Sequence, residues 1–160
     1  MALTFLRNLG IVSSAGISTT KLGAGAIIQV SSIASTASSQ TIATATYTDF
    51  TSLSLSITPS SISNKILIVA NIQANLGAGE GFGVRFLRDA TNVFTTSQNY
   101  AIFNASPNAE VYGMTPIVYI DSPSTTSSIT YKVQGSSYLA ASLVFHEGIK
   151  SVFYLMEIAG

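Results

Sequence analysis

Residues 52–73 (SLSLSITPSSISNKILIVANIQ) constrain the fold of this 160-residue chain more than any other segment. They open with strict alternation between serine and a large apolar residue, which continues to Ile57. A period of two predicts a strand with one buried face. Pro59 interrupts the pattern because proline cannot donate to a ladder, and the apolar run 66–70 predicts a central strand covered on both faces. Two such strands joined by a proline turn indicate a β-sandwich or barrel.

The remainder of the chain continues as short strands, at the spacing of about 8–12 residues that is typical of sandwiches. We expect strands at 26–30, 41–50, 82–87, 93–103, 109–120, 129–134, 138–145 and 151–158. Residues 31–40 are expected to form a loop and residues 88–92 a hairpin turn. Pro116 places its strand at a sheet edge or at a bulge. Because no helical period is sustained beyond the N-terminal segment, the predicted fold class is all-β, an antiparallel β-sandwich or jelly roll.

Residues 1–24 are predicted to form an extended N-terminal arm on a β-sandwich domain of residues 25–160. The large apolar side chains of the arm include Phe5, Leu6, Leu9 and Ile11, and a tract of small residues follows them. A segment this apolar is expected to pack on a surface rather than to remain in water. Two hypotheses stay open: the arm lies on its own domain, or it is a docking peptide that fixes the protein to a larger assembly.

The composition favours burial of surface between subunits. Charged residues make up 9% of the chain, against about 25% in an average protein, and the formal net charge is zero with a mean hydropathy of +0.44. Such a surface resists aggregation poorly, so we expect a homo-oligomer. The composition offers no basic track for nucleic acid and no apolar run of about 18 residues for membrane insertion. Cysteine is absent, which excludes disulfides and thiolate metal sites.

Motifs that would bind a phosphate or a metal are incomplete, and no cofactor is expected. The glycine tract 77–83 lacks the following helix and the Lys-Ser/Thr pair of a phosphate loop. It is interpreted as a glycine-rich hairpin or as a close approach of backbones at a subunit axis. His146 is the single histidine, and Lys150 occupies the position where a zinc-protease helix needs a second one. His146 is therefore expected to be a loop residue.

The acidic residues are scattered singly through predicted turns and strand ends. They are Asp49, Glu80, Asp89, Glu110, Asp121, Glu147 and Glu157. Pairing with Arg85, Arg88 and Lys132 is the favoured interpretation. Asp121, which precedes Ser-Pro-Ser, is also considered as one oxygen ligand of a Ca²⁺ ion. A glycosidase would need two carboxyl groups about 5–10 Å apart, and the sequence identifies no such pair.

Among the residues of the predicted strands, the tyrosines are the strongest candidates for contacts with a binding partner. Four of them are candidate contacts to a trimer partner or to a glycan: Tyr112, Tyr119, Tyr131 and Tyr154. A tyrosine combines a large apolar body with a polar tip, which suits both kinds of contact. The subunit interface is the favoured interpretation.

Several strings resemble bacteriophage tail-fibre and related virion proteins, many of them from marine phages. Residues 19–30 (TTKLGAGAIIQV) are similar to the junction between anchor and knob in that group. The strings similar to its knob are SITPSS (56–61), NKILI (64–68), FLRD (86–89), DSPS (121–124), TYKVQ (130–134) and LMEIA (155–159). The resemblance implies a homotrimeric jelly-roll knob, similar to complement and tumour-necrosis-factor trimers, without catalytic activity. Most such fibres carry a long shaft, and we expect none in this chain.

These observations favour a non-enzymatic virion structural protein, a short trimeric fibre or knob on the particle surface. Its arm would attach to other virion proteins and its domain would adhere to the host surface. The alternatives are a capsid decoration protein that stabilises the shell and a carbohydrate-binding module. An enzyme such as a glycan depolymerase is a further class.

Overall fold

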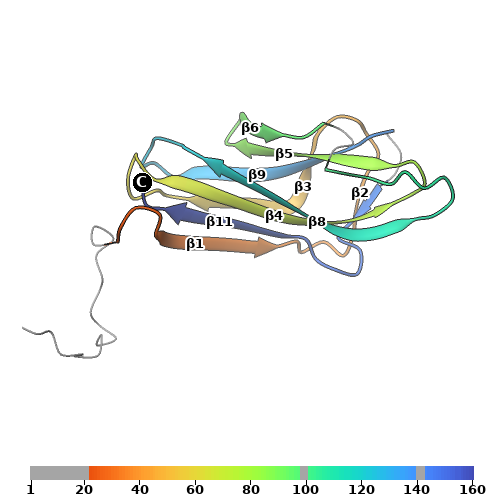
Figure 1. Cartoon of the computed structure of the whole chain (residues 1–160), viewed down its shortest axis with the longest axis horizontal. Helices are drawn as coiled ribbons and strands as arrows, with labels where there is room; N and C mark the ends of the chain where they lie inside the picture. Colours follow the sequence, from red (N-terminus) through yellow and green to blue (C-terminus); the bar gives the residue numbers. More distant parts are fainter. Residues whose placement is uncertain (1–21, 98–100, 140–142) are drawn as a thin grey trace, which may run out of the picture.

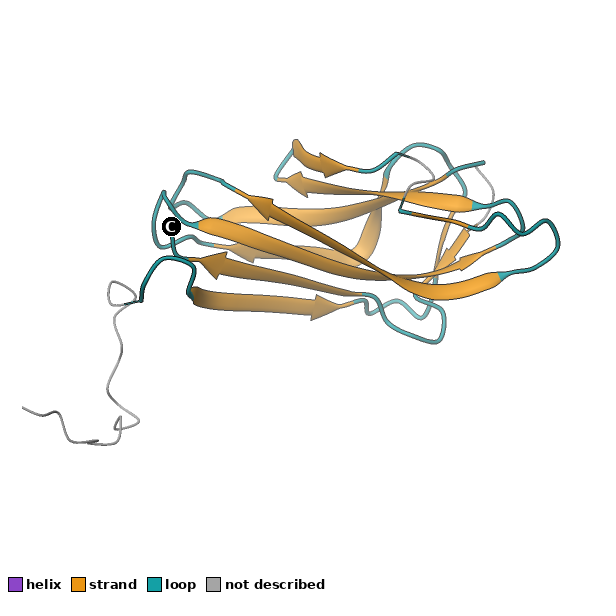
Figure 2. Cartoon of the chain, in the orientation of Figure 1, coloured by secondary structure: helices purple, strands orange, loops and turns teal. Residues whose placement is uncertain are grey.

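The computed structural model describes residues 22–97, 101–139 and 143–160, and this part of the chain is all-β with eleven strands (Figures 1 and 2). The strands form two antiparallel sheets. The β4 sheet contains β1 (Ile27–Ala34), β2 (Gln40–Ile42), β4 (Lys65–Leu76), β8 (Val111–Asp121), β10 (Leu143–Phe145) and β11 (Val152–Ile158). The β9 sheet contains β3 (Thr48–Ile57), β5 (Gly81–Arg88), β6 (Thr91–Thr95), β7 (Ile102–Phe103) and β9 (Ile129–Ser137).

The pairing is that of a jelly roll, so the predicted fold class is confirmed. In the β4 sheet the main order is β1-β11-β4-β8, and in the β9 sheet it is β3-β9-β5-β6. The main strands therefore pair as β1 with β11, β3 with β9, β4 with β8 and β5 with β6. This nested order is that of one long hairpin wound into two sheets. β4 is central and β8 is an edge strand, as Pro116 predicted.

Alternation along the strands builds the core. Ile66, Ile68 and Ala70 of β4 are fully buried between the sheets, where Phe and Tyr side chains of the β9 sheet and Phe153 and Leu155 of β11 meet them. Leu67 and the next alternate residues of β4 point the other way and are only half-buried. The prediction that 66–70 is covered on both faces is thus wrong within a single chain, because the outward side chains of Leu67 and Val69 stay partly exposed in the described chain.

A large bulge interrupts β3. Asp49 pairs with Gln134 and Ser54 with Lys132, so residues 50–53 stand opposite a single residue of β9. The extra residues turn both Phe50 and Leu53 into the core, where their exposed fractions are 2% and 0%.

A glycine of β9 makes room for the ring of Phe50. A Cβ placed on Gly135 would lie 2.4 Å from Cζ of this ring. Phe50 also contacts Phe145 and His146 edge-on, with ring centroids 4.9 and 5.4 Å apart. The bulge and this glycine together fix one end of the core.

The predictions for individual turns, loops and strands are partly confirmed. The turn at 88–92 is confirmed between β5 and β6, and β11 is a central strand as expected. Residues 31–34 belong to β1 instead of a loop, and within 138–145 only β10 is a strand among the described residues. The glycine tract does not form a hairpin, because β4 and β5 lie in different sheets. It carries the chain across the end of the sandwich.

Candidate interaction surface

The outer face of the β4 sheet is apolar across its four main strands. The register of the strands gives its rows: Ile27–Ile158–Lys65, Val30–Met156–Leu67–Ile120, Ser32–Tyr154–Val69–Val118, Ala34–Val152–Asn71–Pro116, Gln73–Met114 and Asn75–Tyr112. Paired residues share a face of the sheet, and the intervening residues of β4 are core residues, so these rows point away from the core. Lys65 is the only charged residue in these rows of the described chain.

Several members of the rows are strongly exposed for their size. Val30 is 56% exposed, Val118 58% and Ile120 51%, and they lie on both edge strands of the sheet. Isolated exposed apolar residues are common on protein surfaces, but a contiguous patch across a whole sheet marks an interaction site. We call these rows the apolar face.

The opposite face of the molecule is polar. On the outer side of the β9 sheet, Gln134 accepts hydrogen bonds from the Arg85 guanidinium and donates to Asp49 Oδ1 over 2.6 Å. Lys132 Nζ lies 3.4 Å from Asp49 Oδ2. The Arg85 guanidinium also lies over the ring of Tyr47, 4.7 Å from its centroid. This sheet therefore has the inward-apolar and outward-polar pattern of a solvated sheet, and the β4 sheet does not.

The structure separates the four candidate tyrosines. Tyr154 and Tyr112 belong to the apolar face; Tyr112 is 63% exposed and donates its hydroxyl to Glu110 over 2.7 Å. That hydrogen bond and the charge of Glu110 raise the pKa of the Tyr112 hydroxyl. Tyr119 packs inward against the core, with its ring 5.3 Å from that of Phe94.

The prediction that Tyr131 contacts a partner or a glycan is wrong, because this side chain is fully buried. Its hydroxyl donates to Asp121 Oδ2 over 2.6 Å, and burial together with this bond raises its pKa. Arg88 Nη1 donates to the same oxygen over 2.8 Å. The cationic partner occupies Asp121, so the carboxylate is an ion-pair member as favoured and the Ca²⁺ interpretation has no support. No cluster of three or more His, Cys, Asp or Glu that could hold a metal occurs among the described residues.

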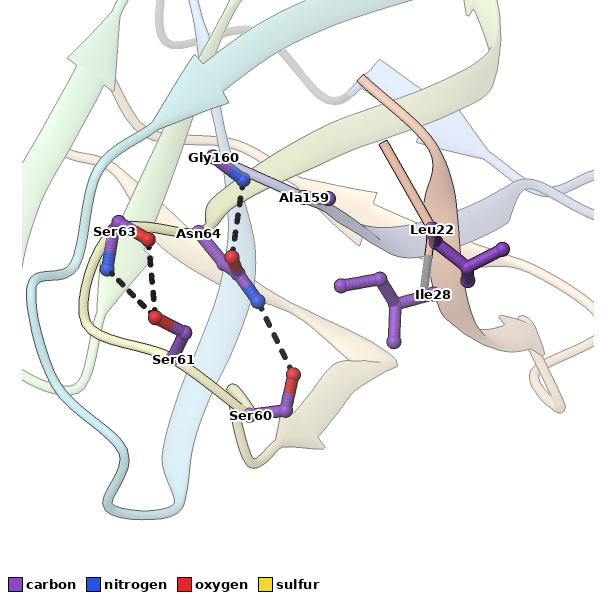
Figure 3. Close-up of a pocket in the computed structure, with 8 residues that line it drawn as sticks. All are labelled: Leu22, Ile28, Ser60, Ser61, Ser63, Asn64, Ala159 and Gly160. Carbon is purple, nitrogen blue, oxygen red and sulfur yellow. Dashed lines mark hydrogen bonds between the residues drawn. The ribbon is translucent and has the colours of Figure 1, made fainter. Parts of the chain in front are cut away.

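The described chain enters the domain beside the end of β11. Gly25 N donates to Ala159 O and Ala159 N to Ala26 O, which joins the entering strand to the last one. A depression of about 360 Å³ lies at this end and is lined by Leu22, Ile28, the 60–64 turn, Ala159 and Gly160 (Figure 3). We call this end of the sandwich the foot. The arm residues Phe5, Leu6, Leu9 and Ile11 lie outside the described residues, so their docking role stays a prediction.

Next to the foot, Glu157 is a fully buried carboxylate inside β11. Its Oε1 accepts hydrogen bonds from Ser60 N, Ser60 Oγ and Asn64 Nδ2, and its Oε2 accepts one from Gln29 Nε2. Burial alone would raise the pKa of this carboxyl, but the hydrogen bonds from Asn64, Gln29 and Ser60 outweigh it and hold the pKa below its usual value. Glu157 lies at a strand end as expected, next to the last residue of β11, and its burial is what the sequence did not predict.

His146 is also buried, at 2% exposure, immediately after β10. Its Nδ1 lies 2.7 Å from Ser151 Oγ, and burial lowers the pKa of the imidazole to about 4. Ser151 itself is fully buried and accepts a hydrogen bond from Gln73 N. The pair therefore holds the last turn of the chain in place, and its serine has no access to a substrate in solution.

Comparison with known proteins gives distant structural similarity alone. No family model and no curated protein matches the sequence. Among solved structures, the VP2 subviral particle of infectious bursal disease virus aligns with 82% of this chain at 11% identity and a TM-score of 0.47. A structure of the Gt strain of that virus aligns with 82% of the chain at 14% identity and a TM-score of 0.37.

This chain covers 33% and 42% of those two proteins, respectively. Similarities of this size carry no functional assignment. The described residues contain no helix that is long and apolar enough to cross a membrane.

Proposed function

We propose that the protein is a non-enzymatic structural protein of a virion, a short trimeric knob displayed on the particle surface for adhesion to the host. The apolar face carries this proposal. Three successive rows of this outer sheet face carry no charge, so the face is suited to burial against another protein surface. Burial of each exposed apolar residue would stabilise an assembly by about 1 kcal/mol. The virion and the number of subunits come from the resemblance of the sequence to phage knobs.

A second copy of the same chain is the proposed cover. The face holds no run of charges that would require a complementary partner, and homo-oligomers with closed symmetry are the commonest assemblies of soluble proteins. A ring of three copies needs two different patches on each subunit. The exposed edge strand β8 with Val118 and Ile120, and the opposite side of the face with Val30 and Met156, offer two such patches.

The arm is the proposed attachment to other virion proteins. The described chain enters at the foot, and the loop between β4 and β5 lies at the far end of the sandwich (Figure 1). An arm bound to the particle would direct that far end toward the host.

The test combines a charge on the apolar face with a footprint of the face. Met114 and Met156 both belong to the apolar face, so their oxidation by hydrogen peroxide reports whether the face is covered. We expect both methionines to be protected in the native protein and to react freely in Val118→Lys. The matched control is Ser56→Lys, which adds the same charge on the exposed outer side of β3.

Free oxidation of both methionines in the native protein, at the rate of Val118→Lys, would contradict the covered face. Imaging of particles then separates the two virion roles, because a decoration protein occupies every lattice point and a fibre occupies few. Density at every lattice point would show that the protein is a decoration protein and not a knob.

A further inference from the structure

The β3 bulge forms a second surface feature, on the polar side of the molecule. Ser52 lies in the bulge with φ of 68°, a left-handed conformation that costs a non-glycine residue about 1–2 kcal/mol. Gln40 brackets the bulge, since its Nε2 donates to Asp49 O over 2.9 Å and its Oε1 accepts from Thr51 N over 2.7 Å. Thr36 Oγ1 lies 2.5 Å from Ser52 Oγ. Side chains from two other segments therefore hold this irregular backbone in one shape.

The held backbone encloses a depression of about 320 Å³, lined by residues 49–54 of β3 and by Lys132 of β9. Its volume is at the lower end of the range of about 300–1,000 Å³ for small-ligand sites. The carboxylate of Asp49 and the ammonium of Lys132 border it at an N–O distance of 3.4 Å, with exposed side-chain fractions of 52% and 42%. Thr51, Ser52 and Ser54 also line the depression, and each carries a hydroxyl.

These groups keep unused hydrogen-bonding capacity. An ammonium has three donors and a carboxylate has about four acceptor positions. Among the described residues Lys132 donates to Asp49 alone, and Asp49 accepts from Lys132 and Gln134. The bond of Gln134 to Asp49 Oδ1 fixes the carboxylate, while the long contact to Lys132 leaves both groups free to bind a ligand.

We propose that the depression at the β3 bulge binds a saccharide. Each hydroxyl of a sugar both donates and accepts, which fits a border made of a fixed carboxylate, an ammonium and protein hydroxyls. A phosphate or sulfate is disfavoured because the Asp49 carboxylate would repel it, and a metal ion is disfavoured because the Lys132 ammonium would repel it. A peptide strand would need a free edge with regular backbone groups, which the bulge disrupts.

The position of the depression suits a displayed adhesion site. It lies at the edge strand β3 of the β9 sheet, and none of its lining residues belongs to the apolar face, so assembly through that face would leave it open on every subunit. Several weak sites on one assembly then bind a surface through multivalency. This use on a particle rests on the proposed function, whereas the binding itself does not.

The experiment is a titration of the full ¹⁵N-labelled chain with the methyl glycosides of glucose, galactose, mannose and N-acetylglucosamine, each at millimolar concentration. We expect at least one glycoside to shift the amide signals of residues 51–54 and to leave those of Tyr154 and Val69 unmoved. Asp49→Asn and Lys132→Gln should each weaken this binding at least about tenfold, the effect of losing one charge-assisted bond. Glu147→Gln, which removes an exposed carboxylate outside the depression, should bind as the native chain does.

Absence of shifts at 51–54 with all four glycosides, or shifts that survive both substitutions, would refute the saccharide site. The solution mass, measured on the same samples, separates this result from the proposed function. An assembly that binds no glycoside refutes the site alone, and a monomer that binds one refutes the covered face alone.

Discussion

The buried carboxylate of Glu157 is expected to be a main stabiliser of the foot, and Glu157→Gln tests this. All four polar contacts to the carboxylate are donors: Ser60 N at 2.6 Å, Ser60 Oγ at 2.9 Å, Asn64 Nδ2 at 2.5 Å and Gln29 Nε2 at 2.5 Å. Glutamine has the same shape but carries an –NH₂ group in place of one oxygen. That group must face a donor whichever way the amide is turned, since donors approach both oxygens.

The cost follows from the less harmful orientation, in which the –NH₂ group faces Gln29. Rotation of the Gln29 amide would relieve the clash, but Gln29 Nε2 also donates to Thr58 O over 2.8 Å and would lose that bond. One charge-assisted bond worth about 1.5–3 kcal/mol is lost, and the remaining three fall to about half their strength. The smaller burial cost of a neutral amide offsets part of this loss. We expect Glu157→Gln to lower the free energy of unfolding by about 2–4 kcal/mol.

Thermal and urea unfolding at a fixed protein concentration measure this effect. For a chain of this size a loss of 1 kcal/mol lowers Tm by about 2–4 °C, so a decrease of about 5–15 °C is expected at pH 7. The stabilisation is present above the usual pKa of a glutamate, because the folded pKa is lowered, and it is lost as pH falls through that folded value. Glu147→Gln, at an exposed turn position, is the control. A loss below about 0.5 kcal/mol, the range of ordinary surface substitutions, would show that the carboxylate of Glu157 does not stabilise the foot.

Three further predictions concern other parts of the chain. Burial lowers the folded pKa of His146 to about 4 from 6.5. Acidification from pH 6.5 to 4 should therefore decrease the free energy of unfolding by about 2–3 kcal/mol, because the unfolded imidazole binds a proton in this range and the folded one does not. An equal decrease in His146→Asn, measured by urea unfolding, would contradict this origin. Gly135→Ala should lower the free energy of unfolding by about 1–3 kcal/mol, because the new Cβ would overlap the ring of Phe50, which is packed against Phe145. In a Phe50→Leu background, calorimetry should show a smaller loss for the same substitution. An equal loss in both backgrounds would contradict the overlap. Deletion of residues 1–20 should leave a folded assembly that no longer attaches to particles in a co-sedimentation assay, and unfolding on deletion would contradict the docking arm.

The fold class could be predicted from sequence because alternation and proline turns determine sheet formation locally. The segments around Leu53 and Ile66 show this: Leu53, Ile57, Ile66 and Ile68 are core residues, and Leu55 is partly buried against the core. Strand boundaries were less predictable where serines and alanines continue a strand, as at residues 31–34 of β1. Such small residues fit loops and strands equally well, and the decision comes from pairing with β11.

Sites that depend on distant contacts could not be predicted. Nothing in LMEIA indicates that Glu157 points inward, because Ser60 and Asn64 reach it from another turn. Tyr131 is different, because the alternation of Ile129, Tyr131 and Val133 with polar residues already favoured its buried face; only its hydroxyl partner Asp121 comes from a distant segment.

One signal of the apolar face was available in the sequence. In residues 111–121, both alternating sets of positions contain apolar side chains, although Pro116 marks an edge strand. An edge strand with two apolar faces cannot be covered by its own sandwich alone.

Light scattering during size exclusion, over a range of dilutions of the unmodified protein, shows whether copies of the chain cover the apolar face. We expect a stable particle of three 16.7 kDa chains that persists on dilution, because the apolar face is buried between copies. A well-behaved monomer of 16.7 kDa at all concentrations would contradict it.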